Sequence, residues 1–181
     1  PYAASKIAAD QLSLSYYRSF GLPVKIIRPF NTYGPRQSAR AVIPTIVTQA
    51  LLKNKIKIGN LNATRDFLYV EDLCSAYEKI LKSNKLFGEV INVGVDNEIS
   101  IKELIVKISK ILKTKLIPIV EKKRVRPHKS EVFRLKCDNK KIKNMTGWKP
   151  KYKIDEGLIK LIKWLKEDDN LKNYKPENYN I

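Results

Sequence analysis

Apolar and polar positions along the chain follow two periods, one typical of helices and one typical of buried strands. Apolar residues spaced three and four positions apart predict helices over residues 2–20, 42–52, 71–81, 101–113 and 154–166. Short apolar or β-branched runs bounded by turn formers predict strands over residues 24–27, 55–58, 64–70, 88–94 and 116–120. Because strands alternate with helices, the pattern predicts an α/β protein whose sheet is at least partly parallel.

Residues with capping preferences mark the ends of several helices. In the first predicted helix, apolar positions such as Ile7 form an amphipathic pattern, and Gly21 provides a stop. Ser100 and Glu103 form a capping box before the helix over 101–113. A further short helix is expected between Asp138, which can cap its start, and Gly147, which ends it.

Two segments rich in turn formers or charge, 28–35 and 121–130, are predicted as loops. Neither a G-x-G-x-x-G nor a G-x-x-x-x-G-K-[ST] sequence occurs in the chain, so it carries no phosphate-binding loop of either type. The chain starts at Pro1 in helix-compatible sequence with no charged or apolar leader. We therefore expect it to be the C-terminal part of a longer protein, with any dinucleotide-binding β-α-β unit upstream.

Composition narrows the class of protein. With 181 residues, 43% apolar and 30% charged, the chain fits a globular domain with a sizeable core. No apolar run approaches the roughly 18–20 residues that a membrane span needs, so a membrane protein is not expected. Cys74, Cys137 and the single histidine, His128, are too few for a disulfide scaffold or a structural zinc site. The cysteine usage favours a reducing compartment, the cytoplasm.

The formal net charge of +18 favours anionic partners, among them nucleic acids and phosphorylated small molecules. Much of the excess is lysine spaced along helices, for example Lys102, Lys107 and Lys110, which is the pattern of a solvated helix face. A compact basic block with interleaved aromatic residues, typical of single-strand binders, is missing from the sequence. The pattern therefore favours a small anionic ligand over nucleic acid.

Tyr2 and Lys6 stand four positions apart, which places them on the same face of the first predicted helix. An ammonium group beside a phenol stabilises the phenolate, and this makes the tyrosine a usable base for a substrate hydroxyl. Small residues between the two leave room for a cofactor against the helix. The alternative is chance, because nine tyrosines in a lysine-rich chain give about one Tyr-x-x-x-Lys spacing at random.

Arg65 at the start of a predicted strand is a second candidate. A guanidinium group there can bind a phosphate through two hydrogen bonds. The alternative is a surface ion pair of Arg65 with Asp66 or Asp72, combined with a helix cap at Asp72. By itself the Arg65 pattern favours the ion pair.

Two further places could contact a ligand. Asn31 follows a predicted strand, and open α/β sheets bind ligands at such strand ends. The alternative for Asn31 is ordinary turn chemistry. Arg124 and Arg126 lie in the loop around Pro127 and could hold an anion, although loop arginines are usually solvated.

Five motifs together resemble the extended short-chain dehydrogenases/reductases that act on nucleotide sugars. They occur in that family's order, over essentially the whole chain, and are Pro1–Lys6 (PYAASK), Arg28–Pro35 (RPFNTYGP), Arg65–Asp72 (RDFLYVED), Asn92–Gly94 (NVG) and Arg126–Pro127. Their order and spacing are far more specific than any single motif.

Within the family the chain looks most like the NAD-dependent nucleotide-sugar 4,6-dehydratases. The closer match, to the N-acetylglucosamine-type enzyme of legionaminic acid pathways, lies in residues 31–44 (NTYGPRQSARAVIP) and 126–134 (RPHKSEVFR). This resemblance implies a role in bacterial surface-sugar (polysaccharide) biosynthesis and a nucleotide-diphosphate sugar as substrate.

The resemblance also implies the fold: the C-terminal part of a Rossmann-type parallel sheet plus a small mixed α/β substrate-binding domain. Residues 1–30 and about 66–95 would be the last elements of the NAD-binding domain, and residues 31–65 and 96–181 would form the substrate-binding domain. The N-terminal part of the NAD-binding domain would lie upstream, so these 181 residues alone are expected to be inactive. The full-length protein would be a homodimer.

The family's functional residues carry over position by position. Tyr2 resembles the catalytic tyrosine and Lys6 the lysine that supports it, and both would also contact NAD, as would Thr32. The substrate-binding positions are Asn31, Arg40, Arg65, Asn92 and Arg126. Arg40 stands next to Ala41, where a related dehydratase subgroup has lysine, and is expected to replace that lysine. No metal site is implied.

In the implied dehydratase reaction, Tyr2 takes the proton of the sugar's C4 hydroxyl while NAD accepts the C4 hydride. Water is then lost across C5 and C6, and the hydride returns to C6. The alternative within the family is a 4-epimerase, in which the hydride returns to the opposite face of C4. Two other classes stay open: a truncated remnant that binds nucleotide sugars without catalysis, and a basic nucleic-acid binder.

Overall fold

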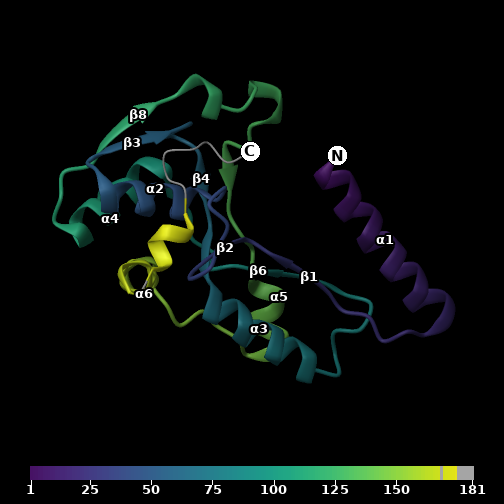
Figure 1. The fold of residues 1–181 in the computed structure, drawn as a ribbon. Helices are drawn as coiled ribbons and strands as arrows, with labels where there is room; N and C mark the ends of the chain where they lie inside the picture. Colours follow the sequence, from purple (N-terminus) through teal and green to yellow (C-terminus); the bar gives the residue numbers. More distant parts are fainter. Residues whose placement is uncertain (168, 175–181) are drawn as a thin grey trace.

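The structure, a computed structural model, describes residues 1–167 and 169–174 (Figure 1). The helices of this part of the chain are α1 (Tyr2–Phe20), α2 (Val42–Leu52), α3 (Val70–Lys82), α4 (Ile101–Leu112), α5 (Lys140–Thr146) and α6 (Ile154–Lys166). Its strands are β1 (Ile26–Pro29), β2 (Asn31–Tyr33), β3 (Lys55–Ile58), β4 (Thr64–Arg65), β5 (Phe67–Tyr69), β6 (Val90–Val93), β7 (Ile99–Ser100), β8 (Ile117–Val120) and β9 (Arg134–Leu135). Short 3₁₀ turns are η1 (Lys122–Arg124), η2 (His128–Ser130) and η3 (Asn170–Asn173).

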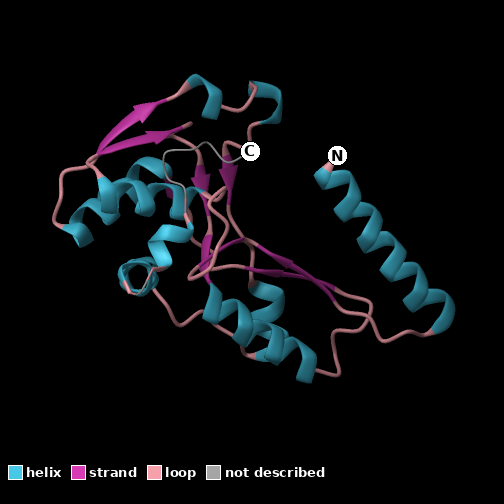
Figure 2. Ribbon diagram, in the orientation of Figure 1, coloured by secondary structure: helices cyan, strands magenta, loops and turns pink. Residues whose placement is uncertain are grey.

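Most strand pairs in the described chain are parallel (Figure 2). The pairs β1–β6, β2–β5 and β3–β8 are each parallel, with Ile26 opposite Val90 in the first and Asn31 opposite Phe67 in the second. In the mixed sheet β7–β4–β9, the central strand β4 is antiparallel to β7 and parallel to β9. The parallel pairing and the alternating helices confirm the predicted α/β class.

Two hydrophobic clusters form the core. The larger one packs α2, α4 and α6 against strands β2, β3 and β5, and its fully buried members include Ile46, Ile56, Leu104 and Leu158. The smaller one packs α3 and α5 against β5 and β6, with Leu68 and Ile91 at its centre. Each fully buried aliphatic side chain contributes roughly 1.5–3 kcal/mol. The assignment of residue ranges to two domains stays a prediction.

The predicted strand over 64–70 is two strands separated by Asp66. The Asp66 carboxylate is buried and binds backbone N–H groups of other segments, so the chain bends there instead of continuing one ladder. The predicted loop over 28–35 is also corrected, because β1 extends to Pro29 and β2 begins at Asn31. Parallel partners cause this: β6 pairs with β1, and β5 pairs with β2.

Helix α1 forms as predicted but lies apart from the other elements (Figure 1). None of its residues is fully buried, although Leu14 and Tyr17 are half-buried, so most apolar positions of the amphipathic pattern stay exposed in the described chain. Its links to the remaining structure include an ion pair between Asp10 and Arg28 at 2.6 Å, and the Tyr17 ring against Gly88. No helix in the described ranges is long and apolar enough to cross a membrane.

Helix caps explain where α4 and α5 begin. The Ser100 hydroxyl accepts the Glu103 N–H at 3.1 Å while the Glu103 carboxylate accepts the Ser100 N–H at 2.7 Å, which confirms the predicted capping box. At α5 the N-cap residue is Asn139, whose side chain makes no cap hydrogen bond, but the Asp138 carboxylate accepts the N–H of Lys140, the first residue of the helix, at 3.0 Å, as the sequence predicts. The amide of Asn139 instead donates to the Gly94 carbonyl at 2.9 Å, because this side chain is buried against the end of β6.

Candidate functional site

A cavity of about 410 Å³ lies between the loop after β2, strand β4 and the segment that connects β8 to β9. Six of the candidate residues named from sequence line it: Asn31, Thr32, Arg40, Arg65, Arg124 and Arg126. They come from four separate parts of the chain, so the fold brings them together. We call this cavity the arginine pocket, because four arginines line it.

Arg65 is held in the wall of the arginine pocket by three oxygen atoms. Its Nη1 donates to the carbonyls of Val132 at 2.6 Å and Thr64 at 2.8 Å, and its Nη2 donates to Glu131 Oε1 at 3.1 Å. The Arg65 and Glu131 side chains are only 13% and 8% exposed. The alternative pairing of Arg65 with Asp66 or Asp72 is therefore wrong.

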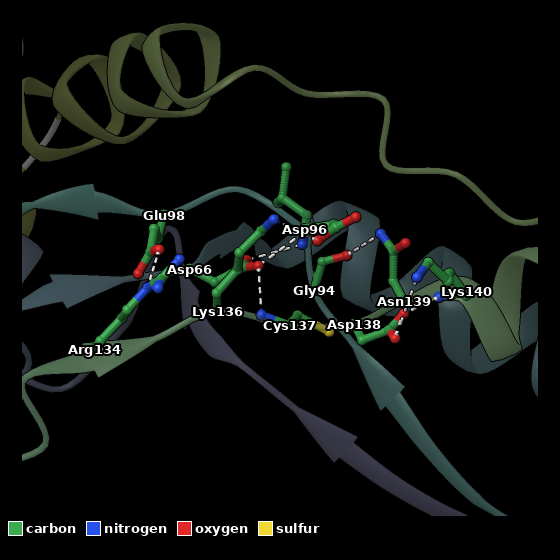
Figure 3. Close-up of polar contacts among 11 residues, drawn as sticks. Asp66, Gly94, Asp96, Glu98, Arg134, Lys136, Cys137, Asp138, Asn139 and Lys140 are labelled. Carbon is green, nitrogen blue, oxygen red and sulfur yellow. Dashed lines mark hydrogen bonds and ion pairs between the residues drawn. The ribbon is translucent and has the colours of Figure 1, made fainter.

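Asp66 acts as a buried junction between three segments (Figure 3). Its carboxylate accepts the backbone N–H groups of Val95 at 2.8 Å, Asp96 at 2.9 Å and Cys137 at 3.2 Å. Burial raises the pKa of Asp66, although these hydrogen bonds act in the opposite direction. The junction fixes the chain directly after Arg65 to the ends of β6 and β9.

Asp72, the other acid weighed as a partner for Arg65, is buried at the start of α3. Its two carboxylate oxygens accept the backbone N–H groups of Lys151 at 2.8 Å and Tyr152 at 3.1 Å. Asp72 therefore anchors the connection between α5 and α6 and leaves Arg65 to the pocket.

The loop after β2 forms a second wall. The Gln37 side-chain amide donates to the Thr32 carbonyl at 2.6 Å, and the Thr32 hydroxyl donates to the Phe30 carbonyl at 3.0 Å. Farther along, the Thr45 hydroxyl donates to the carbonyl of Ala39 at 3.0 Å. Arg40 lies between these anchors, exposed on the pocket rim.

The segment between β8 and β9 closes the third side. Arg124 forms an ion pair with Glu121 at 2.7 Å, and its side chain is 7% exposed. A Cβ atom at Gly59 would lie 2.3 Å from the Arg124 carbonyl oxygen, so only glycine lets this segment approach β3 so closely. Arg126 lies exposed beside it. Four guanidinium groups around one cavity suit an anion with several oxygens.

Three predicted residues do not line the arginine pocket. Tyr2 and Lys6 lie on the exposed α1, where Lys6 Nζ is 5.6 Å from the centroid of the Tyr2 ring. The two side chains are therefore neighbours, as their spacing predicts. Asn92 is half-buried on β6, where it lies opposite Arg28 of β1.

Among the lining residues that sequence reasoning did not name are Glu131 and Gln37. Glu131 follows Arg126 in the same loop, and an acid there gave no signal for pairing with Arg65 on a distant strand. Gln37 stands in the loop after β2, where a lone amide matches no chemical motif. In the described part of the chain no group of three or more His, Cys, Asp or Glu side chains could hold a metal ion.

The family model for GDP-mannose 4,6 dehydratase matches residues 1–161. The chain belongs to this family. The match confirms the resemblance to NAD-dependent nucleotide-sugar dehydratases and epimerases of the extended short-chain dehydrogenase/reductase type. The α/β fold is accordingly similar to that of Rossmann-type enzymes.

Three known proteins show how far the similarity extends. The chain is 34% identical to human dTDP-D-glucose 4,6-dehydratase over 181 residues, which is 97% of this chain and 50% of that protein. It is 34% identical to GDP-6-deoxy-D-mannose reductase of Pseudomonas aeruginosa, over 90% of this chain and 54% of the reductase. The structure of UDP-glucuronic acid 4-epimerase from Bacillus cereus, in complex with UDP-glucuronic acid and NAD, matches with a TM-score of 0.85 at 27% identity, covering 92% of this chain and 52% of that one. The chain thus spans about half the length of these relatives.

Proposed function

We propose that this chain supplies the nucleotide-sugar pocket of an NAD-dependent nucleotide-sugar 4,6-dehydratase. The observation that carries the proposal is the convergence of Arg40, Arg65 and Arg126 with Asn31 on one cavity of about 410 Å³. A nucleoside diphosphate presents a cluster of anionic oxygens, and guanidinium groups bind such oxygens through paired hydrogen bonds. The cavity also lies in the size range of pockets for small ligands.

The roles of the arginines follow from how each is held. Arg65 is fixed by Glu131 and the Val132 carbonyl, so it offers the ligand a preorganised cation at little cost in side-chain entropy. Arg40 and Arg126 are exposed on the rim and can fold over a bound diphosphate. Asn31 supplies an amide to the same cavity. We assign Asn92 a weaker part, since it lies on β6 outside the pocket.

Tyr2 and Lys6 fit the catalytic pair of the family. Their side chains are neighbours on α1, and the small alanine and serine side chains between them leave room for a ligand against the helix. In this proposal Tyr2 takes the proton of the C4 hydroxyl, and Lys6 stabilises the phenolate. NAD, when bound, exchanges hydride with the sugar; Tyr2, Lys6 and Thr32 are the residues that would hold it. The B. cereus epimerase that this chain resembles has NAD in its structure.

The dehydratase assignment is favoured over two others. The matching family model and the human relative, which aligns over 97% of this chain, both carry dehydratase names. The B. cereus structure supports a 4-epimerase as the alternative activity. A pocket without catalysis is the second alternative, because Tyr2 and Lys6 do not line the cavity.

Product analysis of the full-length protein tests the proposal. The protein is incubated with NAD and, separately, with UDP- and GDP-N-acetylglucosamine, dTDP-glucose and GDP-mannose. We expect a 4-keto-6-deoxy sugar from at least one of them. A C4 epimer without loss of water would identify a 4-epimerase, and tight binding without any product would identify a binding module.

A pair of variants separates chemistry from binding in the same assay. Tyr2→Phe keeps the ring but removes the ionisable oxygen, so turnover should fall by roughly 10²–10⁴-fold with binding nearly unchanged. Tyr77→Phe, at an exposed tyrosine on α3, is the matched control and should leave turnover as it is. If Tyr2→Phe lowers affinity but spares turnover, Tyr2 is a packing residue.

We also propose a cytoplasmic homodimer for the full-length protein. Apolar side chains on α1, among them Ile7, Leu12 and Phe20, are exposed in the described chain, and either the upstream part of the NAD-binding domain or a second copy would cover them. Light scattering on the purified full-length protein would give twice the monomer mass. A monomer at micromolar concentration would contradict this.

A further inference from the structure

Tyr174, which follows η3, reaches back to the loop that forms one wall of the arginine pocket. Its hydroxyl donates a hydrogen bond to the main-chain carbonyl of Gln37 at 2.9 Å, although the two residues are 137 positions apart. Its ring meets Trp164 edge-on, with the centroids 6.4 Å apart, and packs against the larger hydrophobic cluster. The contact therefore joins the pocket loop to the core through one side chain.

Gln37 passes this contact on to the pocket. Its side-chain amide donates to the Thr32 carbonyl at 2.6 Å, and its own N–H donates to the Gly34 carbonyl at 3.3 Å. Gln37 thus connects two parts of this loop through its side chain and its N–H. Its carbonyl, the remaining backbone group, accepts from the Tyr174 hydroxyl. Thr32, Gln37 and Arg40 all line the cavity, so a shift of Gln37 moves the wall that carries Arg40.

The side-chain oxygen of Gln37 gives a second reason to connect this residue with a ligand. It is buried and has no hydrogen-bond partner in the described structure. An unpaired buried acceptor costs free energy, so a hydrogen-bond donor on a bound ligand would recover that cost here. The amide cannot simply turn over, because its nitrogen is engaged with the Thr32 carbonyl.

The segment that carries Tyr174 is itself anchored to α6. The Asn170 side chain donates to the Trp164 carbonyl at 2.9 Å, and the Tyr174 N–H donates to the Leu171 carbonyl at 3.1 Å. Tyr174 is thus held from the α6 side, and its hydroxyl is a fixed donor. Burial raises the pKa of Tyr174, which keeps that hydroxyl protonated.

We infer that Tyr174 is a positioning residue for the arginine pocket: by holding the Gln37 carbonyl it fixes the loop over residues 34–41 and so places Arg40 for an anionic ligand. The identity of that ligand as a nucleoside diphosphate rests on the proposed function. The effect on the loop does not, because it follows from the hydrogen bonds alone.

Tyr174→Phe tests the inference, since it keeps the ring against Trp164 and removes only the hydroxyl. Amide hydrogen exchange, read by mass spectrometry, should become about two- to tenfold faster in peptides that cover residues 34–41, as expected for the loss of one hydrogen bond. Exchange in α4 should stay unchanged, and the melting temperature should fall by no more than a few degrees, about what the loss of one hydrogen bond costs. Tyr77→Phe, the matched control on α3, should exchange like the wild type throughout.

Binding of UDP, used as the probe, gives the second readout. If UDP binds the wild type, Tyr174→Phe should raise its Kd by about two- to tenfold, and Tyr77→Phe should not. The inference would be overturned if Tyr174→Phe exchanged at the wild-type rate in residues 34–41. It would also be overturned if the loop exchanged faster but the affinity for UDP stayed unchanged. Faster exchange throughout the variant, with a melting temperature lowered by more than a few degrees, would overturn it as well, because this indicates a merely structural role. If the wild type binds no UDP, that result counts against the proposed function, and the loop exchange alone decides on Tyr174.

Discussion

Arg65 and Glu131 form an ion pair with 3.1 Å between Nη2 and Oε1 in the wall of the arginine pocket, across 66 positions of sequence. Glu131 is the one carboxylate among the described residues that line the cavity. The pair has two consequences. It orders the guanidinium group, and it places a negative charge where an anionic ligand must bind.

Glu131→Gln should therefore tighten binding of inorganic pyrophosphate. The amide keeps an acceptor for Arg65 but removes the negative charge, and the gain from a charge of this kind is about 1 kcal/mol, or roughly fivefold in Kd. The free energy of unfolding should fall by about 1–2 kcal/mol, because the ion pair with Arg65 becomes a hydrogen bond from the same guanidinium cation to a neutral amide. Isothermal titration calorimetry and urea denaturation measure the two effects.

Arg65→Ala is the contrasting variant. It leaves the Glu131 carboxylate nearly buried without its cation, which should cost about 3 kcal/mol of stability and weaken pyrophosphate binding more than about tenfold. If Glu131→Gln weakened binding as strongly as Arg65→Ala does, the charge of Glu131 would not oppose the ligand, and the pair would act as one positioning unit.

Asp66→Asn should destabilise the protein by about 1–3 kcal/mol, because an amide cannot accept all of the N–H groups that the carboxylate accepts. The effect should depend on pH. Since the folded-state pKa of Asp66 is raised, its contribution to stability is fully present below the unfolded pKa and is lost as pH rises through the folded pKa. The difference in free energy of unfolding between the wild type and Asp66→Asn should therefore become smaller as pH rises through the folded-state pKa.

Urea denaturation at a series of pH values from acid to neutral gives the measurement. Glu78→Gln is the control, because Glu78 lies on the exposed face of α3 and forms an ion pair with Lys82 at the surface. Its stability should match that of the wild type at neutral pH, because an exposed surface pair contributes little. A gap for Asp66→Asn that widened with pH would show that the hydrogen bonds, and not burial, dominate the titration of Asp66.

The elements that sequence alone predicted well are those whose signals are local. The helices over 42–52 and 154–166 begin and end as predicted because apolar periodicity runs through their whole length. Strand β2 has three residues and forms because β5 pairs with it. The sequence of residues 31–33 alone therefore does not predict a strand. The break at Asp66 likewise depends on N–H groups about thirty positions away.

The same division applies to the site. Arg65 and Arg126 are predicted as binding residues through the family resemblance, whose motifs lie in a few adjacent residues, and both line the cavity. Their part in binding stays a prediction. Glu131 and the Tyr174–Gln37 contact could not be predicted, since each depends on two segments that only the fold brings together. The separation of Tyr2 from the arginine pocket also required the structure, because helical spacing fixes neighbours on α1 but not what α1 faces.

Asp72→Asn should loosen the connection between α5 and α6. One carboxylate oxygen is replaced by an N–H₂ group, which cannot accept a hydrogen bond. One of the two hydrogen bonds, from the N–H of Lys151 or from the N–H of Tyr152, is therefore lost. We expect a loss of about 1–3 kcal/mol and faster trypsin cleavage after Lys151, which mass spectrometry of the digest detects. Glu78→Gln again serves as the control. An unchanged cleavage rate at Lys151 would mean that packing of Tyr152, and not Asp72, holds this connection.

Gly157 and Tyr33 provide the last test, of packing between α6 and β2. A Cβ atom at Gly157 would lie 2.1 Å from the Tyr33 hydroxyl oxygen, inside a buried site where Tyr33 donates to the Ile154 carbonyl at 3.2 Å. Gly157→Ala should therefore destabilise by about 1–3 kcal/mol, although alanine alone would favour the helix by about 1 kcal/mol. Tyr33→Phe removes the clashing oxygen, so the double variant should be more stable than the sum of the two single changes predicts. Additive effects in thermal unfolding would show that the Tyr33 hydroxyl does not set the distance between α6 and β2, and that the ring atoms Tyr33 Cζ and Tyr69 Cδ2, 2.8 Å and 2.9 Å from that Cβ position, set it instead.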